Sequence, residues 1–319
     1  MMTGTIRLVA LVVAAGMVCA ACAPAPREDP LSSGDHFVDL PGVRLHYRVE
    51  GEGPVLLLHP GGPGMEWKYA RMPELEKFLK VVYLDPRGAG ASSKPLTPGT
   101  YSLDGYVEDL DALRAHLGRE RVFLLGHSHG GMVAQAYALA HADRLQGLIL
   151  CATTPTTGEA WTKDVESSLQ EKRSEPWFAD AEAAFTEEEK AKTDAELAAI
   201  FRREVPLYFY RYEPFRETLE PILRDLHMAV EPLRQFGLEA STFDLRPRLA
   251  ALRAPTLILA GRHDFVCGPR WAEALHQGIA GSRLVVLENS GHFLYLEEAA
   301  AFAEAVRGFI EPLSHGERR

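Results

Sequence analysis

Runs of mostly apolar residues recur along the chain, and polar segments separate them. The six runs cover residues 55–58, 81–84, 122–125, 148–151, 256–260 and 283–287. Such runs are typical of strands that are buried on both faces, as in a parallel sheet. Residues 36–40 and 43–49 instead alternate apolar and polar positions, which predicts an antiparallel edge hairpin around Pro41-Gly42. The pattern predicts an α/β fold with a mostly parallel central sheet of about eight strands.

Several segments between these runs carry apolar residues at helical spacing. The clearest covers residues 103–117, which Ser102 is suited to cap and Gly118 to end. Similar spacing occurs over residues 132–140, 269–277 and 302–310. Because helices alternate with buried strands, we expect them to cover both faces of the sheet.

Residues 156–245 differ from the rest of the chain, since they hold many prolines, aromatic residues and charges but no strand-like run. Residues 180–197 are strongly acidic, which is typical of a solvated helix face. Thr186 with Glu189, and Thr193 with Glu196, each fit a capping box at a helix start. We therefore predict a helical cap over residues 156–245, inserted into a core of residues 36–155 and 246–313.

Residues 122–133 read as a buried strand, a sharp turn and a helix. Gly126, Ser128 and Gly130 fit the G-x-S-x-G pattern of a nucleophile elbow. The flanking positions need glycine because strand and helix nearly touch there. The turn would lift Ser128 to the open end of the sheet, and the His129 amide would face developing negative charge from a helix N-terminus.

A serine nucleophile needs a base, and the base needs an acid that orients it. Asp264 and His292 both follow predicted strands, at the sheet end where catalytic groups collect. Their order in the chain, with Ser128 first, is the order expected for an elbow serine. Asp244 is an alternative acid. The competing histidines are less suitable, because they flank the turn or lie on loops that favour backbone contacts: His59, His127, His129 and His263.

Four segments together resemble the α/β-hydrolases, and among them the prolyl aminopeptidases (proline iminopeptidases). They are residues 59–64 (His-Pro-Gly-Gly-Pro-Gly), 85–92, 126–131 and 261–267. The resemblance covers residues 36–312 and implies a serine hydrolase with a cap. It also implies that the His129 amide and that of Gly62 or Gly61 stabilise an oxyanion. Two departures are Pro60, which is inserted after His59, and His129, which replaces the usual Trp.

The resemblance further implies a small-molecule or short-peptide substrate and removal of an N-terminal residue, such as proline. A cap glutamate would then bind the free amine, and Glu204 or Glu213 is the candidate. An esterase or lactonase with the same triad is the alternative. A non-catalytic ligand-binding lipoprotein is a further alternative.

Charge and composition restrict the partners. The chain holds 34 Lys and Arg against 44 Asp and Glu, and no basic stripe, so we expect no nucleic-acid partner. No Cys/His cluster has zinc spacing, and serine hydrolysis needs no cofactor, so neither a metal nor a cofactor is predicted. The sequence predicts no oligomeric state.

The N-terminus is typical of an exported protein. Arg7 precedes an uncharged apolar run over residues 8–18, which is too short to span a membrane and suits a signal peptide. Residues 1–22 resemble a lipoprotein signal with Cys22 as the lipidated residue, which would anchor the protein to the membrane. Ordinary cleavage after Ala21 or Ala23 is the alternative. Residues 23–35 would form a flexible linker.

Two cysteines belong to the folded part, Cys151 and Cys267. Both end or follow predicted strands, so a disulfide between them is one outcome in an oxidising compartment. The commoner outcome is a pair of partly buried free thiols.

Overall fold

The computed structural model describes residues 29–97, 100–240 and 242–315. Its centre is one eight-stranded sheet in the order β1-β2-β4-β3-β5-β6-β7-β8. The strands are β1 (Gly34–Leu40), β2 (Val43–Glu50), β3 (Val55–His59), β4 (Lys80–Leu84), β5 (Val122–His127), β6 (Leu145–Cys151), β7 (Thr256–Gly261) and β8 (Arg283–Leu287). Strands β1 and β2 pair antiparallel, as do β2 and β4, and the other pairs are parallel. The predicted sheet is confirmed.

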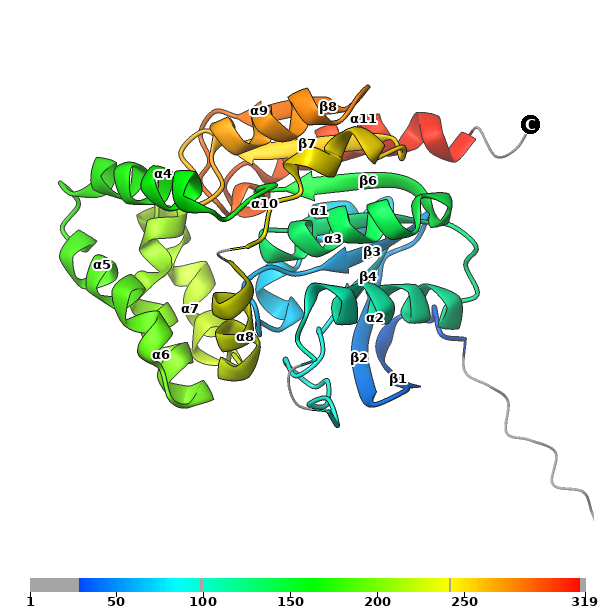
Figure 1. The fold of residues 1–319 in the computed structure, drawn as a ribbon, viewed down its shortest axis with the longest axis horizontal. Coiled ribbons are helices and arrows are strands. Elements are labelled where there is room, and N and C mark those ends of the chain that lie inside the picture. Colours follow the sequence, from blue (N-terminus) through cyan, green and yellow to red (C-terminus); the bar gives the residue numbers. More distant parts are fainter. Residues whose placement is uncertain (1–28, 98–99, 241, 316–319) are drawn as a thin grey trace, which may run out of the picture.

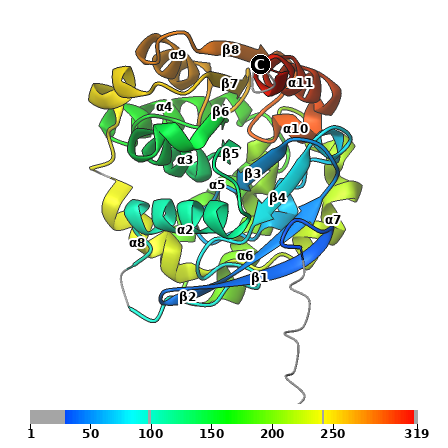
Figure 2. The same cartoon turned by 90° about the vertical axis from the view of Figure 1, so that its right-hand side faces the viewer.

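Helices cover both faces of this sheet (Figures 1 and 2). Those of the core are α1 (Pro73–Glu76), α2 (Leu103–His116), α3 (His129–Ala140), α9 (Pro269–Gly278), α10 (Leu294–Glu297) and α11 (Ala299–His315). Alternate residues of one strand point to opposite faces. Leu56 and Leu58 of β3 pack on the side of α1 and α11, and Leu57 packs on the side of α2, α3 and α9. Two apolar cores, one on each face, therefore hold the strands in place.

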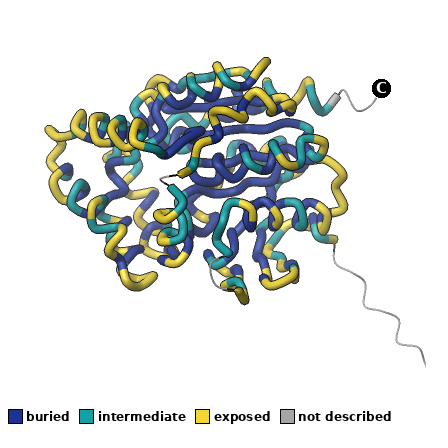
Figure 3. The backbone as a smooth tube through the Cα atoms, in the orientation of Figure 1, coloured by how far each residue is buried: buried dark blue, intermediate teal, exposed yellow. Residues whose placement is uncertain are grey.

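Helices α4–α8 follow β6 and precede β7, within the predicted cap. They are α4 (Glu159–Leu169), α5 (Phe178–Glu187), α6 (Asp194–Glu204), α7 (Arg216–Arg224) and α8 (Val230–Ala240). Figure 1 shows α4–α8 gathered at one end of the sheet, and Figure 3 shows their outer surfaces largely exposed. The amide of Ala229 donates to Gly64, and that of His292 donates to Tyr208. The cap therefore rests on the loops at the carboxyl ends of the strands.

Two local predictions fail. The Thr193–Glu196 capping box is present at the start of α6, but Thr186 lies inside α5 and its hydroxyl donates to the Ala183 carbonyl. The predicted linker extends too far, because β1 already begins at Gly34 and Leu31 is buried against the core.

In the described part of the chain, no helix combines the length and apolarity needed to cross a membrane. The predicted signal peptide and Cys22 lie outside the described residues.

Candidate active site

Ser128 occupies the turn between β5 and α3 with φ 54° and ψ −121°, a region that non-glycine residues rarely adopt. Its backbone is held from two sides. The Ser128 amide donates to the Cys151 carbonyl at 2.9 Å, and the Thr153 hydroxyl donates to the Ser128 carbonyl at 2.7 Å. The neighbouring strand β6 therefore fixes a strained turn with its serine at the end of the sheet.

The glycines on either side of Ser128 are required by close contacts. A Cβ on Gly126 would lie 2.2 Å from the Gly130 carbonyl oxygen. A Cβ on Gly130 would lie 2.3 Å from the carbonyl oxygens of His59 and Pro60. Both distances are far shorter than van der Waals contact, so the turn excludes any larger residue at either position.

Asp264 and His292 meet beyond the ends of β7 and β8. His292 Nδ1 lies 2.8 Å from Asp264 Oδ2, and both side chains are buried. The amides of Val266 and Cys267 donate to Asp264 Oδ1 at 2.9 and 3.0 Å. Burial opposes ionisation of this carboxyl, but His292 and the two amides hold its pKa below the ordinary value. The arrangement fixes an imidazole beside a carboxylate at neutral pH.

His127 connects the serine turn to the His292 loop. Its Nε2 lies 3.1 Å from the His292 carbonyl oxygen, and the two rings are 4.8 Å apart between centroids. Burial lowers the pKa of His127 to about 3, so the ring is neutral and its Nε2–H donates to that oxygen. The sequence pattern predicts no catalytic role for His127, and the structure makes it a brace between the loops that carry Ser128 and His292.

The loop of residues 59–64 passes directly over the serine. A Cβ on Gly61 would lie 2.6 Å from Ser128 Cβ. The Gly61 amide donates to the Tyr69 hydroxyl, so that amide is already used. Of the two glycines predicted for an oxyanion hole, this favours Gly62, which has a positive φ of 46°.

Asp85 and Arg87 brace a neighbouring loop. Asp85 accepts from the amides of Trp67 and Ala91 at 2.8 and 2.9 Å. Arg87 binds Asp109 through two hydrogen bonds of 2.7 and 2.8 Å. Neither residue is a candidate for chemistry.

The sequence pattern does not reveal the role of Glu297, a carboxylate that binds three backbone amides. Glu297 Oε1 accepts from the amides of Tyr210 and Arg211, at 2.9 and 3.0 Å, and Oε2 accepts from the Gly291 amide at 2.6 Å. Burial raises the pKa of Glu297 to about 7 despite these bonds. Glu297 thus joins the cap to the loop that carries His292. Its sequence neighbourhood, an acidic pair in a short helix, gives no sign of this role.

The cap places Glu204 close to His292, with one aromatic ring between them. The Tyr208 ring lies 5.5 Å from the His292 ring, and its hydroxyl donates to Glu204 Oε1 at 3.0 Å. Glu204 is fully buried, and its Oε2 has no hydrogen-bond partner among the described residues. Burial, and then the charge of Glu188, raise the pKa of Glu204 well above its ordinary value. A buried carboxyl with a bare oxygen is therefore present one side chain from the histidine.

Comparisons with known proteins fit this geometry. The sequence profile of the family described as alpha/beta hydrolase fold matches residues 54–299. The chain belongs to this family. The proline iminopeptidase of Saccharolobus solfataricus is 30% identical to this hydrolase over 294 residues, which cover 85% of this chain and 90% of that protein. The resemblance to prolyl aminopeptidases is therefore confirmed.

Solved structures extend the comparison. A hydrolase from Pseudomonas aeruginosa PA01 is 30% identical with a TM-score of 0.67, over 88% of this chain and 99% of that one. The enol-lactonase from Burkholderia xenovorans LB400 is 26% identical with a TM-score of 0.65, over 86% and 99% of the two chains. Hydrolases that differ in substrate thus share this fold.

Three other residues that the sequence offered for the site have different partners in the structure. Glu213 is exposed and pairs with Arg216 at 3.8 Å. Asp244 pairs with Arg246 at 2.7 Å near the surface, so it is no alternative to Asp264. His263 stacks on Tyr210, with ring centroids 3.7 Å apart.

The acidic run of the cap is not wholly solvated. Glu188 lies partly buried beside Glu204, and burial and the charge of Glu189 raise its pKa to about 7. The structure therefore brings a second carboxyl group toward Glu204 from a run whose sequence predicts a solvated helix face.

Cys151 and Cys267 are both free and buried, so the disulfide alternative is wrong. Burial raises the pKa of both thiols well above the ordinary value. The Cys267 amide, rather than its thiol, contributes to the site by donating to Asp264.

Proposed function

We propose that this chain is a serine hydrolase that acts through an acyl-enzyme. The Ser128 hydroxyl attacks the substrate carbonyl carbon while His292 takes its proton. The bond to the leaving group then breaks, and His292 returns the proton to that group. A water molecule, deprotonated by His292, releases the acyl group and restores Ser128.

The surroundings of these residues support the assigned roles. Asp264 holds the Nδ1 proton of His292, which leaves Nε2 free to act as a base, and its charge stabilises the imidazolium that forms. The amides of His129 and Gly62 stabilise the oxyanion. The remaining candidate, the Gly61 amide, already donates to Tyr69. Electrostatic stabilisation of this kind is commonly the largest catalytic contribution.

The substrate we propose is a peptide with a free N-terminus, from which the hydrolase releases the first residue, proline in particular. The single observation that carries this choice is the bare Oε2 atom of Glu204. Buried polar atoms almost always have partners, so an orphan beside an active site points to a ligand that brings one. A substrate ammonium group would donate to this oxygen and offset the unfavourable burial of the charged carboxylate.

The side chains around Glu204 suit a small apolar acyl group. The Tyr208 ring packs on Phe201, Phe265 and Phe293, with centroids 5.3–5.8 Å apart. Such a wall fits a pyrrolidine ring by apolar contact. Glu188 places a second carboxyl group near the same amine.

Glu204→Gln tests the amine assignment, and Glu213→Gln is the matched control because Glu213 is exposed. For a prolyl arylamide, Glu204→Gln should lower kcat/KM by about 100-fold, mainly through KM, because it removes a buried ion pair. On an uncharged acyl ester the same variant should stay within about threefold of wild type. Glu213→Gln should match wild type on both substrates. Equal losses of Glu204→Gln on the two substrates would contradict the assignment.

An esterase or lactonase is the second candidate, favoured by the similarity to the enol-lactonase. It shares the acyl-enzyme chemistry and would show as esters hydrolysed well with no preference for a free amine. Fluorophosphonate labelling separates both enzymes from a non-catalytic binding protein. Wild type should be labelled and Ser128→Ala should not.

We also infer export with Cys22 as a lipid anchor, from Arg7, the apolar run 8–18 and Cys22. Cys22→Ser should move the protein from the membrane fraction to a soluble exported form. Wild-type protein found entirely in the cytosol would contradict export.

A further inference from the structure

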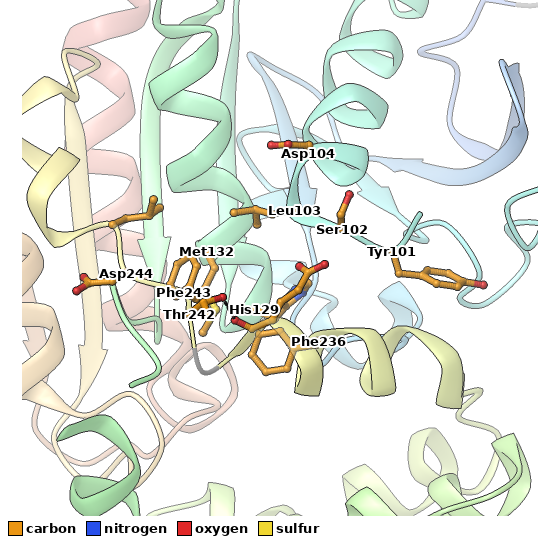
Figure 4. Close-up of a pocket in the computed structure, with 12 residues that line it drawn as sticks. Tyr101, Ser102, Leu103, Asp104, His129, Met132, Phe236, Thr242, Phe243 and Asp244 are labelled. Atoms are coloured by element: carbon orange, nitrogen blue, oxygen red, sulfur yellow. Dashed lines mark hydrogen bonds between the residues drawn. The ribbon is translucent and has the colours of Figure 1, made fainter. Parts of the chain in front are cut away.

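A pocket of about 390 Å³ opens on the side of the nucleophile turn that faces α2 and α8. Figure 4 shows His129, Met132 and Phe236 grouped on one side of it, with Tyr101 and Asp104 across from them. His129 directly follows Ser128, so this pocket starts one residue from the nucleophile. None of its residues takes part in the reaction steps assigned above, apart from the His129 amide.

The His129 ring is the unexplained group of this pocket. The residue is only 7% exposed, and among the described residues its ring has aromatic contacts but no hydrogen-bond partner. The rings of Tyr106 and Phe236 hold it, with centroids 5.5 and 5.1 Å away. Burial lowers its pKa to about 3, so the imidazole is neutral at physiological pH and can accept or donate one hydrogen bond at each nitrogen. No nitrogen of His129 is among the fully buried, unpartnered atoms of the described residues, so the ring reaches the open space of the pocket and can contact a polar ligand group there.

Different elements supply the pocket and the Glu204 group. Glu204 and Tyr208 reach the site from α6 and the turn after it, next to His292 beyond β8. The pocket is built from α2, α3 and α8. In a serine hydrolase the acyl group and the leaving group extend in different directions from the attacked carbonyl. If Glu204 binds the acyl side, the pocket is placed for the leaving side.

The charge of the pocket restricts what it can bind. Asp104 and Glu239 line it, and no lysine or arginine is among its described lining residues. The remaining acid, Asp244, is paired with Arg246. A leaving group with a carboxylate would meet repulsion here, whereas an uncharged or cationic amine with an aromatic or apolar body would contact Phe236 and Met132 favourably.

We propose that this pocket binds the leaving group, with His129 as its polar contact, and that it selects uncharged or cationic amines over those that carry a carboxylate. The inference rests on the proposed acyl-enzyme function. It implies that the hydrolase prefers peptide amides, arylamides or longer peptides to free dipeptides, whose released residue carries a carboxylate close to the cleaved bond.

The first experiment compares prolyl-phenylalanine with prolyl-phenylalanine amide. Wild type at low salt should favour the amide in kcat/KM by about fivefold or more, because two like charges face the carboxylate in a partly solvated site. The double variant Asp104→Asn/Glu239→Gln should reduce this ratio to about twofold, and salt should reduce it in wild type. A ratio that neither the variant nor salt changes would overturn the charge selection.

The second experiment separates the leaving-group side from the acyl side. Phe236→Ala should slow acylation by prolyl arylamides about tenfold through lost aromatic contact, and leave the rate of deacylation unchanged, because the leaving group has then departed. His129→Phe should slow acylation likewise. Leu238→Ala is the matched control, because Leu238 lies on the same helix and is 77% exposed; it should change neither rate.

The leaving-group role of the pocket and the acyl-enzyme mechanism can fail separately. If Phe236→Ala slowed deacylation as much as acylation, the pocket would hold the acyl group and the leaving-group assignment would fail, with the acyl-enzyme intact. If fluorophosphonate failed to label Ser128 of the wild-type protein, the proposed function itself would fail.

Discussion

The carboxylates at the end of the sheet and those in the cap differ in how completely they are hydrogen-bonded. At the sheet, Asp264, Asp85 and Glu297 each accept at least three hydrogen bonds, and their positions are fixed by them. In the cap, Glu204 has one hydrogen bond and one bare buried oxygen. A group that must hold catalytic geometry is fully bonded before substrate arrives. The oxygen of Glu204 that has no partner is instead open to a ligand, which is why we propose it for substrate recognition.

The largest expected effect concerns the sheet. Ser128→Ala and His292→Ala should each lower kcat by about 10⁴–10⁶, and the double variant should be little worse, because the residues act as a unit. The measurement is steady-state hydrolysis of a prolyl arylamide, with circular dichroism as the folding control. A Ser128→Ala protein that kept more than about a tenth of wild-type activity would exclude Ser128 as nucleophile.

Two glycine substitutions contrast the packing of the two regions. Gly130→Ala should lower the free energy of unfolding by about 2–3 kcal/mol, because its Cβ would meet two carbonyl oxygens at 2.3 Å. Gly237→Ala in α8 has nothing within 4 Å of its Cβ, and should raise stability by about 0.5–1 kcal/mol through helix propensity. Urea denaturation measures both. Similar effects at the two sites would contradict the close approach at the elbow.

Glu204 should make the stability of the protein depend on pH. Its folded pKa is raised above the ordinary value of 4.5, so its contribution is fully present below pH 4.5 and is lost as pH rises through the folded pKa. Glu188, raised to about 7, acts in the same direction. At pH 8, Glu204→Gln should therefore raise the free energy of unfolding above that of wild type. At pH 4.5 it should have little effect. A variant less stable than wild type at pH 8 would contradict a buried, unpaired carboxylate.

The smallest effect concerns the thiols. Cys151 and Cys267 are buried, with raised pKa values, so a thiol reagent should react with them slowly in the native protein and fully after unfolding. Thiol counting in denaturant without reductant should give two free thiols from these positions in the mature domain. A count of zero would show a disulfide and would require a rearrangement beside Asp264.

The sheet and the cap also differ in how well their features could be predicted from the sequence. The elbow was predictable because its requirements are local: a buried strand, glycines at Gly126 and Gly130, and a helix. Asp264 and His292 were predictable because parallel strands end at one edge of the sheet. Local patterns failed in the cap. Thr186 fits a capping box as well as Thr193 does, but α5 has already begun at Phe178, so no helix starts there.

Whether a cap residue is buried depends on packing between segments that are distant in sequence. Residue spacing along the chain does not predict such contacts. Glu204 and Glu213 both precede a proline within two residues, and both were candidates for binding an amine. The structure buries Glu204 under Tyr208 and leaves Glu213 exposed. His127 and Glu297 were missed for the same reason, since their partners lie far away in sequence.

The most direct test compares the wild-type enzyme on two substrates that differ only in the substituent on the N-terminal nitrogen. These are a prolyl arylamide and its N-acetylated form, which has the same leaving group but no ammonium. We predict that kcat/KM is larger for the free amine by about 100-fold or more, because only that substrate pairs with Glu204. Equal kcat/KM values for the two substrates would contradict the aminopeptidase assignment and leave the esterase reading in its place.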